Sequence, residues 1–217
     1  MFGFDASVFH LDWNNILINT VFTDPATGTQ FGANGNGRRA RVTGAEGTFT
    51  LRPMRGFTGI LNLAWTDAKL RDDTTPAPGI LNLTGGLAGD RLPYTPRIQA
   101  SLSVDYEWAL AGNARAYVGG NVRIVGDEPS AFNATYRATF HRRLTIDGYT
   151  TLDLRAGVDL GRVSISAYAR NFTNSHGLVS AGYPTTIPAV VGGTATPFAT
   201  VSSIRPRTIG MTLGFAY

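Results

Sequence analysis

Residues 97–108 read RIQASLSVDYEW, and the polarity of their side chains alternates at every position. Successive side chains of a β-strand point to opposite faces, so this stretch predicts a strand with one apolar and one polar face. The apolar face would hold Ile98, Ala100, Leu102, Val104, Tyr106 and Trp108. The polar face would hold Arg97, Gln99, Ser101, Ser103, Asp105 and Glu107.

The same period of two recurs along the chain. It is clear at 115–124, 151–160 and 208–217, and weaker at 2–12, 16–22, 41–51, 57–68 and 163–172. The sequence therefore predicts an all-β protein of about nine antiparallel strands, without a convincing helical period. Most of these segments approach the roughly 9 to 11 residues with which a tilted strand crosses a bilayer.

Composition excludes several classes of protein. Of 217 residues, 43% are hydrophobic and 16% charged, and no stretch reaches the roughly 18 apolar residues of a membrane helix. The chain has no Cys, which excludes disulfides, thiolate zinc sites and cysteine nucleophiles. The net charge of +4 comes from basic residues spread along the chain, so no nucleic-acid partner is expected. A membrane β-barrel stays possible, because alternating strands have a mean hydropathy near zero.

The connections between the expected strands differ systematically in length. Short links fall at 13–15, 53–56, 109–114 and 160–161, and long ones at 23–40, 69–96, 126–148 and 173–204. Short turns at one rim and long loops at the other are typical of an outer-membrane barrel, whereas a soluble sandwich would mix the two.

The polar faces carry ionised side chains, which indicates what those faces meet. In a small soluble barrel they would crowd a dry core, so they face water or a wide, wet lumen. The lumen-facing candidates are Arg97, Asp105, Glu107, Arg115, Arg123, Asp153, Arg155 and Arg170. Such charges could line a solute path or simply form cross-strand ion pairs.

Aromatic residues and turn registers give two further expectations. An aromatic girdle at the short-turn rim would comprise Trp13, Phe49, Phe57, Trp108, Phe215 and Tyr217. A two-residue turn at 160–161 would pair Asp159 with Arg162, and the turn after Trp108 would place Glu107 opposite Arg115.

Three stretches resemble the TonB-dependent outer-membrane receptors, in the C-terminal part of their barrel. LDLRAGVDLGRVSISAYARNFTN at 152–174 is similar to their penultimate hairpin with its Asn-containing end. RPRTIGMTLGFAY at 205–217 is similar to their closing strand, and RLPYTPR at 91–97 to a phrase common among them. The resemblance implies an antiparallel transmembrane β-barrel segment, part of a larger barrel of about 22 strands.

The same resemblance implies location, partners and missing parts. Residues 1–217 would be the C-terminal part of the barrel in the bacterial outer membrane, without the plug domain and signal peptide of an intact receptor. The parent would contact membrane lipid, take up a scarce small-molecule solute such as a siderophore, vitamin or saccharide, and reach the TonB energy-coupling system only through the missing N-terminal part. Phe215 and Tyr217 resemble the terminal signal read by the barrel assembly machinery; a mere girdle role is the alternative.

Candidate binding residues fall in the long connections, and catalytic ones are not expected. Solute contacts could come from Tyr94, Phe132, Tyr136, Phe140, His141 and Tyr183. His10, His141 and His176 are far apart and lack metal-ligand spacing, so no enzyme activity, cofactor or metal site is expected. Two other functions remain open: a small self-contained outer-membrane barrel acting as a pore, structural protein or membrane enzyme, and a soluble β-sandwich binding module.

Overall fold

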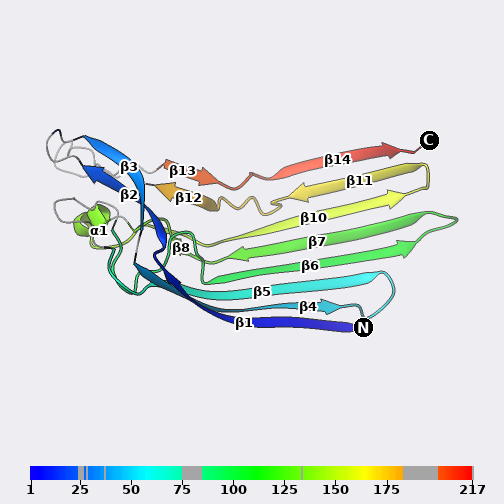
Figure 1. The fold of residues 1–217 in the computed structure, drawn as a ribbon. Helices are drawn as coiled ribbons and strands as arrows, with labels where there is room; N and C mark the ends of the chain where they lie inside the picture. The colour runs from blue at the N-terminus through cyan, green and yellow to red at the C-terminus, as the bar shows by residue number, and fades with distance from the viewer. Residues whose placement is uncertain are drawn as a thin grey trace.

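The structure, a computed structural model, describes residues 1–23, 27, 29–36, 38–74, 85–132, 134–182 and 200–216. Its main feature is one antiparallel sheet of eight strands in the order β1-β4-β5-β6-β7-β10-β11-β14 (Figure 1). These strands are β1 (Phe2–Asn14), β4 (Arg39–Leu51), β5 (Phe57–Leu70), β6 (Ile98–Ala109), β7 (Arg115–Val125), β10 (Tyr149–Asp159), β11 (Val163–Arg170) and β14 (Thr208–Phe215). The prediction of an all-β, antiparallel fold is confirmed.

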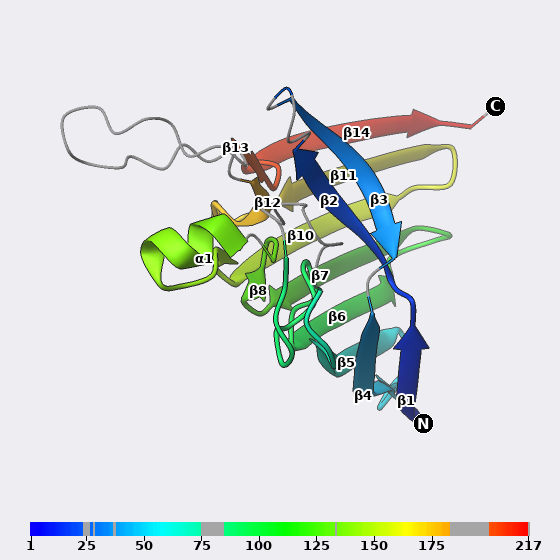
Figure 2. The same cartoon turned by 60° about the vertical axis from the view of Figure 1, so that its left-hand side comes forward.

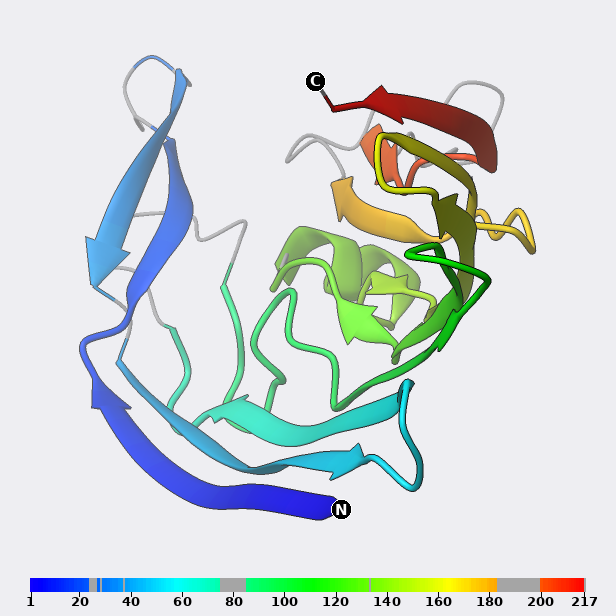
Figure 3. The same ribbon diagram turned by 90° about the vertical axis from the view of Figure 1, so that its right-hand side faces the viewer.

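The sheet curves into an open arc. Seen along the strands, β1 and β14 lie at the two ends of the arc and are separated by a gap (Figure 3). Among the described residues no ladder joins these two strands, so each presents one unpaired edge. The short turns and both termini lie at one end of the strands, and the long connections lie at the other (Figure 1).

The ninth expected strand forms outside this sheet. β2 (Leu17–Thr23) pairs with β3 (Gln30–Asn36) in a separate hairpin, which rises from the ends of β1 and β4 (Figure 3). The expected short link at 13–15 therefore leads into this arm instead of turning between two strands of the main sheet. Its alternation gave the same signal as a membrane strand, because period two identifies a strand and not its partner.

Smaller elements gather at the end with the long connections. They are β8 (Glu128–Pro129), α1 (Ala134–Phe140), β9 (Thr145–Ile146), β12 (Leu178–Gly182) and β13 (Thr200–Ser203), with α1 beside β8 (Figure 2). The sequence did not predict α1, since seven residues span only two helical turns and show no clear period. Among the described residues, no helix is long and apolar enough to cross a membrane.

Cross-strand register assigns the two faces of the sheet. Partners in a ladder share a face, and following them from strand to strand puts Ala40 and Leu70 on the same face as the polar residues of β6 and β7. Ala40 and Leu70 pack with Ile16 and with Phe132, which precedes α1. Because α1 lies inside the arc (Figure 3), the polar face is concave and the apolar face convex.

The convex face is apolar over most of its area. From β6 onward it carries Ile98, Ala100, Leu102, Val104, Tyr106, Trp108, Ala116, Val118, Val122, Ile124, Leu152, Leu154, Ala156, Val158, Val163, Ile165, Ala167, Ala169, Ile209, Met211, Leu213 and Phe215. Many of these side chains are exposed to the surroundings. An exposed apolar surface of this extent needs lipid or another protein against it.

The registers at two turns differ from the predictions by two residues. Asp159 lies opposite Ser164 and not Arg162, and Glu107 lies opposite Tyr117 and not Arg115. The turn after β10 is longer than two residues, with Gly161 at φ 89° and its N–H donating to Asp159 Oδ1 at 2.8 Å. A shift of two residues keeps every side chain on its face, which is why the polarity pattern did not reveal the error.

Candidate functional site

The candidate site is the polar concave face. Seven of the eight predicted lumen-facing residues lie on it by register: Asp105, Glu107, Arg115, Arg123, Asp153, Arg155 and Arg170. An open hollow of about 470 Å³ lies against its middle, over β6, β7, β10 and β11. Its polar lining includes Ser103, Asp105, Tyr117, Asn121, Asp153, Arg155, Ser166, Tyr168 and Arg170.

Arg97 departs from the prediction. It precedes β6, and its Nη2 lies 3.7 Å from Oδ1 of Asp67, which alternates with Trp65 on the convex face of β5. Alternation constrains a side chain only within the ladder, so the residue before β6 is free to turn outward.

An ion pair crosses strand β7 in the centre of the hollow. Oδ1 of Asp105 on β6 accepts hydrogen bonds from Arg155 on β10, 2.6 Å from Nη2 and 3.2 Å from Nε. Gly119 is the ladder partner of both residues. A Cβ at Gly119 would lie 2.0 Å from Asp105 Oδ1, so the glycine leaves the space in which the two charges meet.

Other charges on this face are also partnered. Glu107 Oε1 lies 3.2 Å from Arg115 Nη1, a diagonal pair in the observed register. Asp153 Oδ1 accepts the N–H of Asn171 at 2.7 Å, and the Arg170 guanidinium lies 5.1 Å from the Tyr168 ring centroid. The hollow is thus lined by polar groups held in fixed positions.

Tyrosine rings on the concave face lie over glycines of the next strand. Tyr117 faces its ladder partner Gly157, where an added Cβ would come within 2.7 Å of the ring. Tyr168 faces Gly210 in the same way, with an added Cβ 2.5 Å from its hydroxyl oxygen. The rings therefore cover the glycine backbone of the next strand, and both line the hollow.

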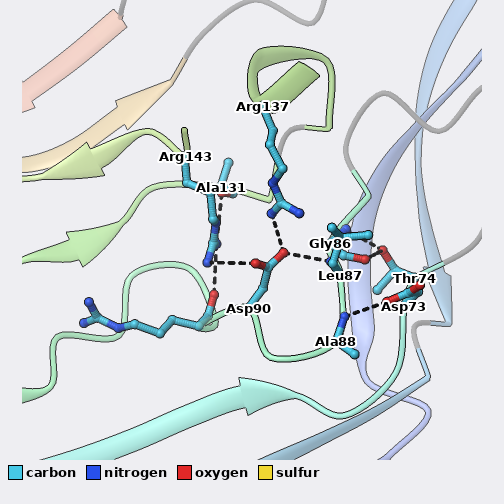
Figure 4. A network of polar contacts seen from close by, with 10 residues as sticks. Asp73, Thr74, Gly86, Leu87, Ala88, Asp90, Ala131, Arg137 and Arg143 are labelled. Carbon is cyan, nitrogen blue, oxygen red and sulfur yellow. Dashed lines mark hydrogen bonds and ion pairs between the residues drawn. The ribbon is translucent and has the colours of Figure 1, made fainter. Parts of the chain in front are cut away.

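A second polar cluster joins two of the long connections, at the end of the strands opposite the short turns (Figure 4). Asp90 accepts hydrogen bonds from Arg137 and, at 2.7 Å, from the N–H of Leu87, and its Oδ1 lies 3.8 Å from Arg143 Nη1. Arg143 Nη2 donates to the carbonyls of Arg91 (2.9 Å) and Ala131 (3.2 Å). Residues 85–97 and the described residues of 126–148 are therefore one packed unit.

The charge of Arg143 lies in a largely buried position within this cluster. The Arg143 side chain is 17% exposed, and its guanidinium lies 5.5 Å from the centroid of the Phe132 ring. Burial lowers the pKa of Arg143, with Asp90 acting in the opposite direction and Arg137 and Arg91 adding to the decrease. An arginine stays protonated despite such a shift, so Asp90 is its compensating charge. Sequence reasoning missed this cluster, because no local pattern connects positions so far apart.

The predicted solute contacts in the loops are only partly exposed. Tyr136 is 4% exposed and packs on Phe140 at 4.5 Å between ring centroids, and Phe132 is buried in the core. Both therefore support the loop and do not present a free ring, which corrects the expectation. Tyr94 and His141 are exposed, and Tyr183 lies outside the described residues. Tyr94 also lines an apolar hollow of about 490 Å³ together with Trp13 and Phe132.

Four of the six predicted girdle residues lie together. Phe49, Phe57, Trp108 and Phe215 lie on the convex face at the short-turn end of their strands. Trp13 was wrongly placed: it lies on the concave face opposite Ala40, at the end with the long connections, because the link at 13–15 leads into the β2–β3 hairpin and is not a short turn of the main sheet. Tyr217 lies outside the described residues.

Within the described ranges, no group of three or more His, Asp or Glu side chains is arranged to hold a metal ion. His10 bonds with Thr43 on the neighbouring strand at 2.9 Å, far in sequence from His141 and His176.

Comparisons with known proteins agree with this architecture. The siderophore receptor PiuA from Acinetobacter baumannii has a TM-score of 0.66 at 15% identity, covering 100% of this chain and 26% of that one. FpvA, the pyoverdine outer membrane receptor of Pseudomonas aeruginosa PAO1, has a TM-score of 0.65 at 16% identity, and the match covers 100% of this chain and 27% of FpvA. BauA, the ferric preacinetobactin receptor of A. baumannii, has a TM-score of 0.60 at 18% identity, and the match covers 99% of this chain and 27% of BauA.

These likenesses, at such low identity, show the fold alone, and the chain spans about a quarter of the length of each receptor. No curated protein matches the sequence. The family model described as TonB dependent receptor-like, beta-barrel, matches residues 1–172. The chain therefore belongs to the TonB-dependent receptor β-barrel family of bacterial outer-membrane proteins.

Proposed function

We propose that this chain forms the C-terminal part of the barrel wall of an energy-coupled outer-membrane receptor that takes up a scarce solute. The observation that carries the proposal is the open eight-stranded arc, in which β1 and β14 each have one edge that no other described strand pairs with, and whose two faces have opposite polarity. Unpaired edges are satisfied when further strands complete a closed barrel. In an intact barrel of about 22 strands, the concave face becomes the inner wall.

The concave residues then have roles in the lumen. The Asp105–Arg155 pair, Asp153 and Arg170 line the hollow at mid-height, where they meet water, a passing solute or the plug domain. The Asp105–Arg155 ion pair, the hydrogen bond of Asp153 with Asn171 and the contact of Arg170 with the Tyr168 ring hold these side chains in place, so the wall presents a fixed pattern of charge. Coupling to TonB belongs to the part of the receptor outside this chain.

A siderophore is the solute class best supported. PiuA is described as a siderophore receptor, FpvA is bound to pyoverdine, and BauA is a receptor for ferric preacinetobactin. The ends of the long connections offer Tyr94 and His141 as exposed contacts, and Tyr94 also lines the apolar hollow together with Trp13. Vitamins and saccharides are the other classes to be tested.

Phe215, together with Tyr217, serves in this proposal as the signal for barrel assembly. The side chains of Ile209, Met211, Leu213 and Phe215 all lie on the convex face of an edge strand, 57% to 76% exposed. An exposed apolar strand edge is suited to recognition by strand addition.

A small self-contained barrel is the second candidate, because eight strands is an allowed number for one. The gap between β1 and β14 opposes it, since a closed barrel pairs its first and last strands. A soluble sandwich is opposed by the exposed apolar convex face.

Growth under nutrient limitation tests the proposal. A strain lacking the full-length gene is complemented with the complete reading frame or with a frame deleted for residues 85–97. Iron-limited medium with one ferric siderophore at a time should restore growth only with the complete frame. Separate arms supply vitamins and saccharides. Equal growth with and without the gene in every arm would reject an uptake function.

A further inference from the structure

The convex face of β1, β4 and β5 changes from apolar to charged at one level. Toward the short turns it carries Phe2, Phe4, Ala6 and Val8 on β1, Leu51, Phe49, Gly47 and Ala45 on β4, and Phe57, Leu61, Leu63 and Trp65 on β5. Beyond the row Val8–Ala45–Trp65 it carries His10, Asp12 and Asn14, then Thr43, Arg41 and Arg39, then Asp67 and Lys69. Three adjacent strands thus switch in the same row.

The switch is local to these strands. On β6, β7, β10 and β14 the convex face stays apolar up to Ile98, Ile124, Leu152 and Ile209, near the ends with the long connections. The charged rows are therefore a feature of β1, β4 and β5, which run on for about two more rows than their neighbours.

The level of the switch matches the edge of a bilayer. The apolar part of β5, Phe57 to Trp65, has nine residues, which is the roughly 9-residue minimum for a tilted crossing strand. Trp65 sits in the last apolar row and is 47% exposed, as expected of an interfacial aromatic residue. The charged rows then lie at the depth of the lipid head groups.

The charged patch consists of His10, Asp12, Arg39, Arg41, Asp67, Lys69, Asp72 and Arg97. Ion pairs join Arg41 to Asp12, Arg39 to Asp72 and Lys69 to Asp67, each at 2.8 Å, and Arg97 shares Asp67 at 3.7 Å. Four permanent cations therefore share three carboxylates.

The Arg41 guanidinium uses only part of its hydrogen-bond donors. Only its Nε bonds with Asp12, and within the described part of the chain its two terminal nitrogens have no hydrogen-bond partner. Lys69 is the ladder partner of Arg41, and both side chains are more than a third exposed. A guanidinium fork next to an ammonium group suits a phosphate oxygen cluster.

We propose that this charged patch binds the phosphate groups of lipids in the outer leaflet of the membrane. A lipid whose chains cover Ala45 and Trp65 would bring its head group onto Arg41 and Lys69, so the apolar and ionic contacts reinforce each other. The proposal rests on the outer-membrane location of the family and not on solute uptake.

The test uses the full-length receptor, purified in detergent, and lipid A as the probe, in its bisphosphorylated form or with both phosphates removed. Wild-type receptor should bind the phosphorylated form at least about fivefold more tightly, since each nearby cation contributes about 1 kcal/mol. The double variant Arg41→Gln/Lys69→Gln should lose that preference. Arg123→Gln, a cation of the concave face, should retain it.

Folding is checked by heat-modifiable migration on a gel, and the wild-type comparison holds whether or not the double variant folds. Equal affinity of the wild type for the two forms of lipid A would overturn the proposal. So would an unchanged preference in a folded double variant. Loss of solute uptake in any variant would bear on the proposed function and leave this test unaffected.

Discussion

Asp105 and Arg155 meet across the strand that separates them, with Oδ1 of the aspartate 2.6 Å from Nη2 of the arginine. The intervening strand contributes Gly119, the ladder partner of both. A charge pair that would normally join neighbours thus spans three strands and ties the centre of the concave face together.

Replacing Gly119 with Ala should break this arrangement. The new methyl group would lie 2.0 Å from the Asp105 carboxylate and 3.0 Å from Arg155 Nε. We expect a loss of about 1–2 kcal/mol in the free energy of unfolding, as for other overpacked sites. Urea unfolding of the full-length receptor in detergent measures it. The control is Gly59→Ala, whose nearest neighbour would be an unstrained 3.5 Å away; equal losses in both variants would disprove the role of Gly119.

Asp90→Asn should loosen the packed loop unit. Asp90 is 15% exposed and compensates the buried charge of Arg143, so its neutralisation should cost about 2–3 kcal/mol locally. Hydrogen exchange should accelerate at residues 85–92 and 134–143 together. Asp127→Asn is the matched control, because the Asp127 side chain is 63% exposed and its ion pair with Arg91 should be worth less than about 1 kcal/mol. Acceleration in only one of the two segments would argue against a shared unit.

Asn171 should be the critical residue of the stretch 171–174. It is 5% exposed, has φ 47°, accepts the Ser175 N–H and donates to the carbonyls of Ser175 and Arg205, all at 2.9 Å. Asn171→Ala should lose about 2–4 kcal/mol, because it removes these bonds and places Ala in the left-handed region.

Asn171→Gly separates the two causes, since glycine adopts positive φ freely and lacks only the bonds. It should retain part of the lost stability. If Gly and Ala are equally harmful in urea unfolding, the backbone conformation contributes nothing.

Glu128 gives a pH-dependent prediction. Burial raises its pKa, with Arg91 acting in the opposite direction. Because the folded state raises this pKa, it favours the protonated form of Glu128. The resulting contribution to the stability of the folded state is fully present below the ordinary pKa of about 4.5, and it is lost as the pH rises through the pKa of the folded state. Glu128→Gln should therefore slow amide exchange around the β8–β9 pair at pH 7, relative to wild type, and change little at pH 4. A variant-to-wild-type ratio independent of pH would contradict this.

Period-two polarity predicted the eight strands of the main sheet to within a few residues, and with them the faces of Asp105, Arg155 and Phe215. It did not predict the register at the turns, because a shift of two residues restores the same polarity pattern. It also did not predict that β2 pairs with β3. The Asp90 cluster and α1 depend on contacts between residues far apart in sequence, for which a single chain holds no local signal. Trp13 was misplaced because a link of three residues looked like a turn.

In the proposed receptor the concave face meets water inside a barrel and the convex face meets lipid. Because the chain has no Cys, single cysteines at Leu102, Ser103, Ile165 and Ser166 can carry a spin label in the reconstituted full-length receptor made otherwise cysteine-free. We expect labels at Ser103 and Ser166 to collide with a water-soluble nickel chelate, and labels at Leu102 and Ile165 to collide with membrane-dissolved oxygen. The same accessibility at neighbouring positions, or the reverse alternation, would contradict it.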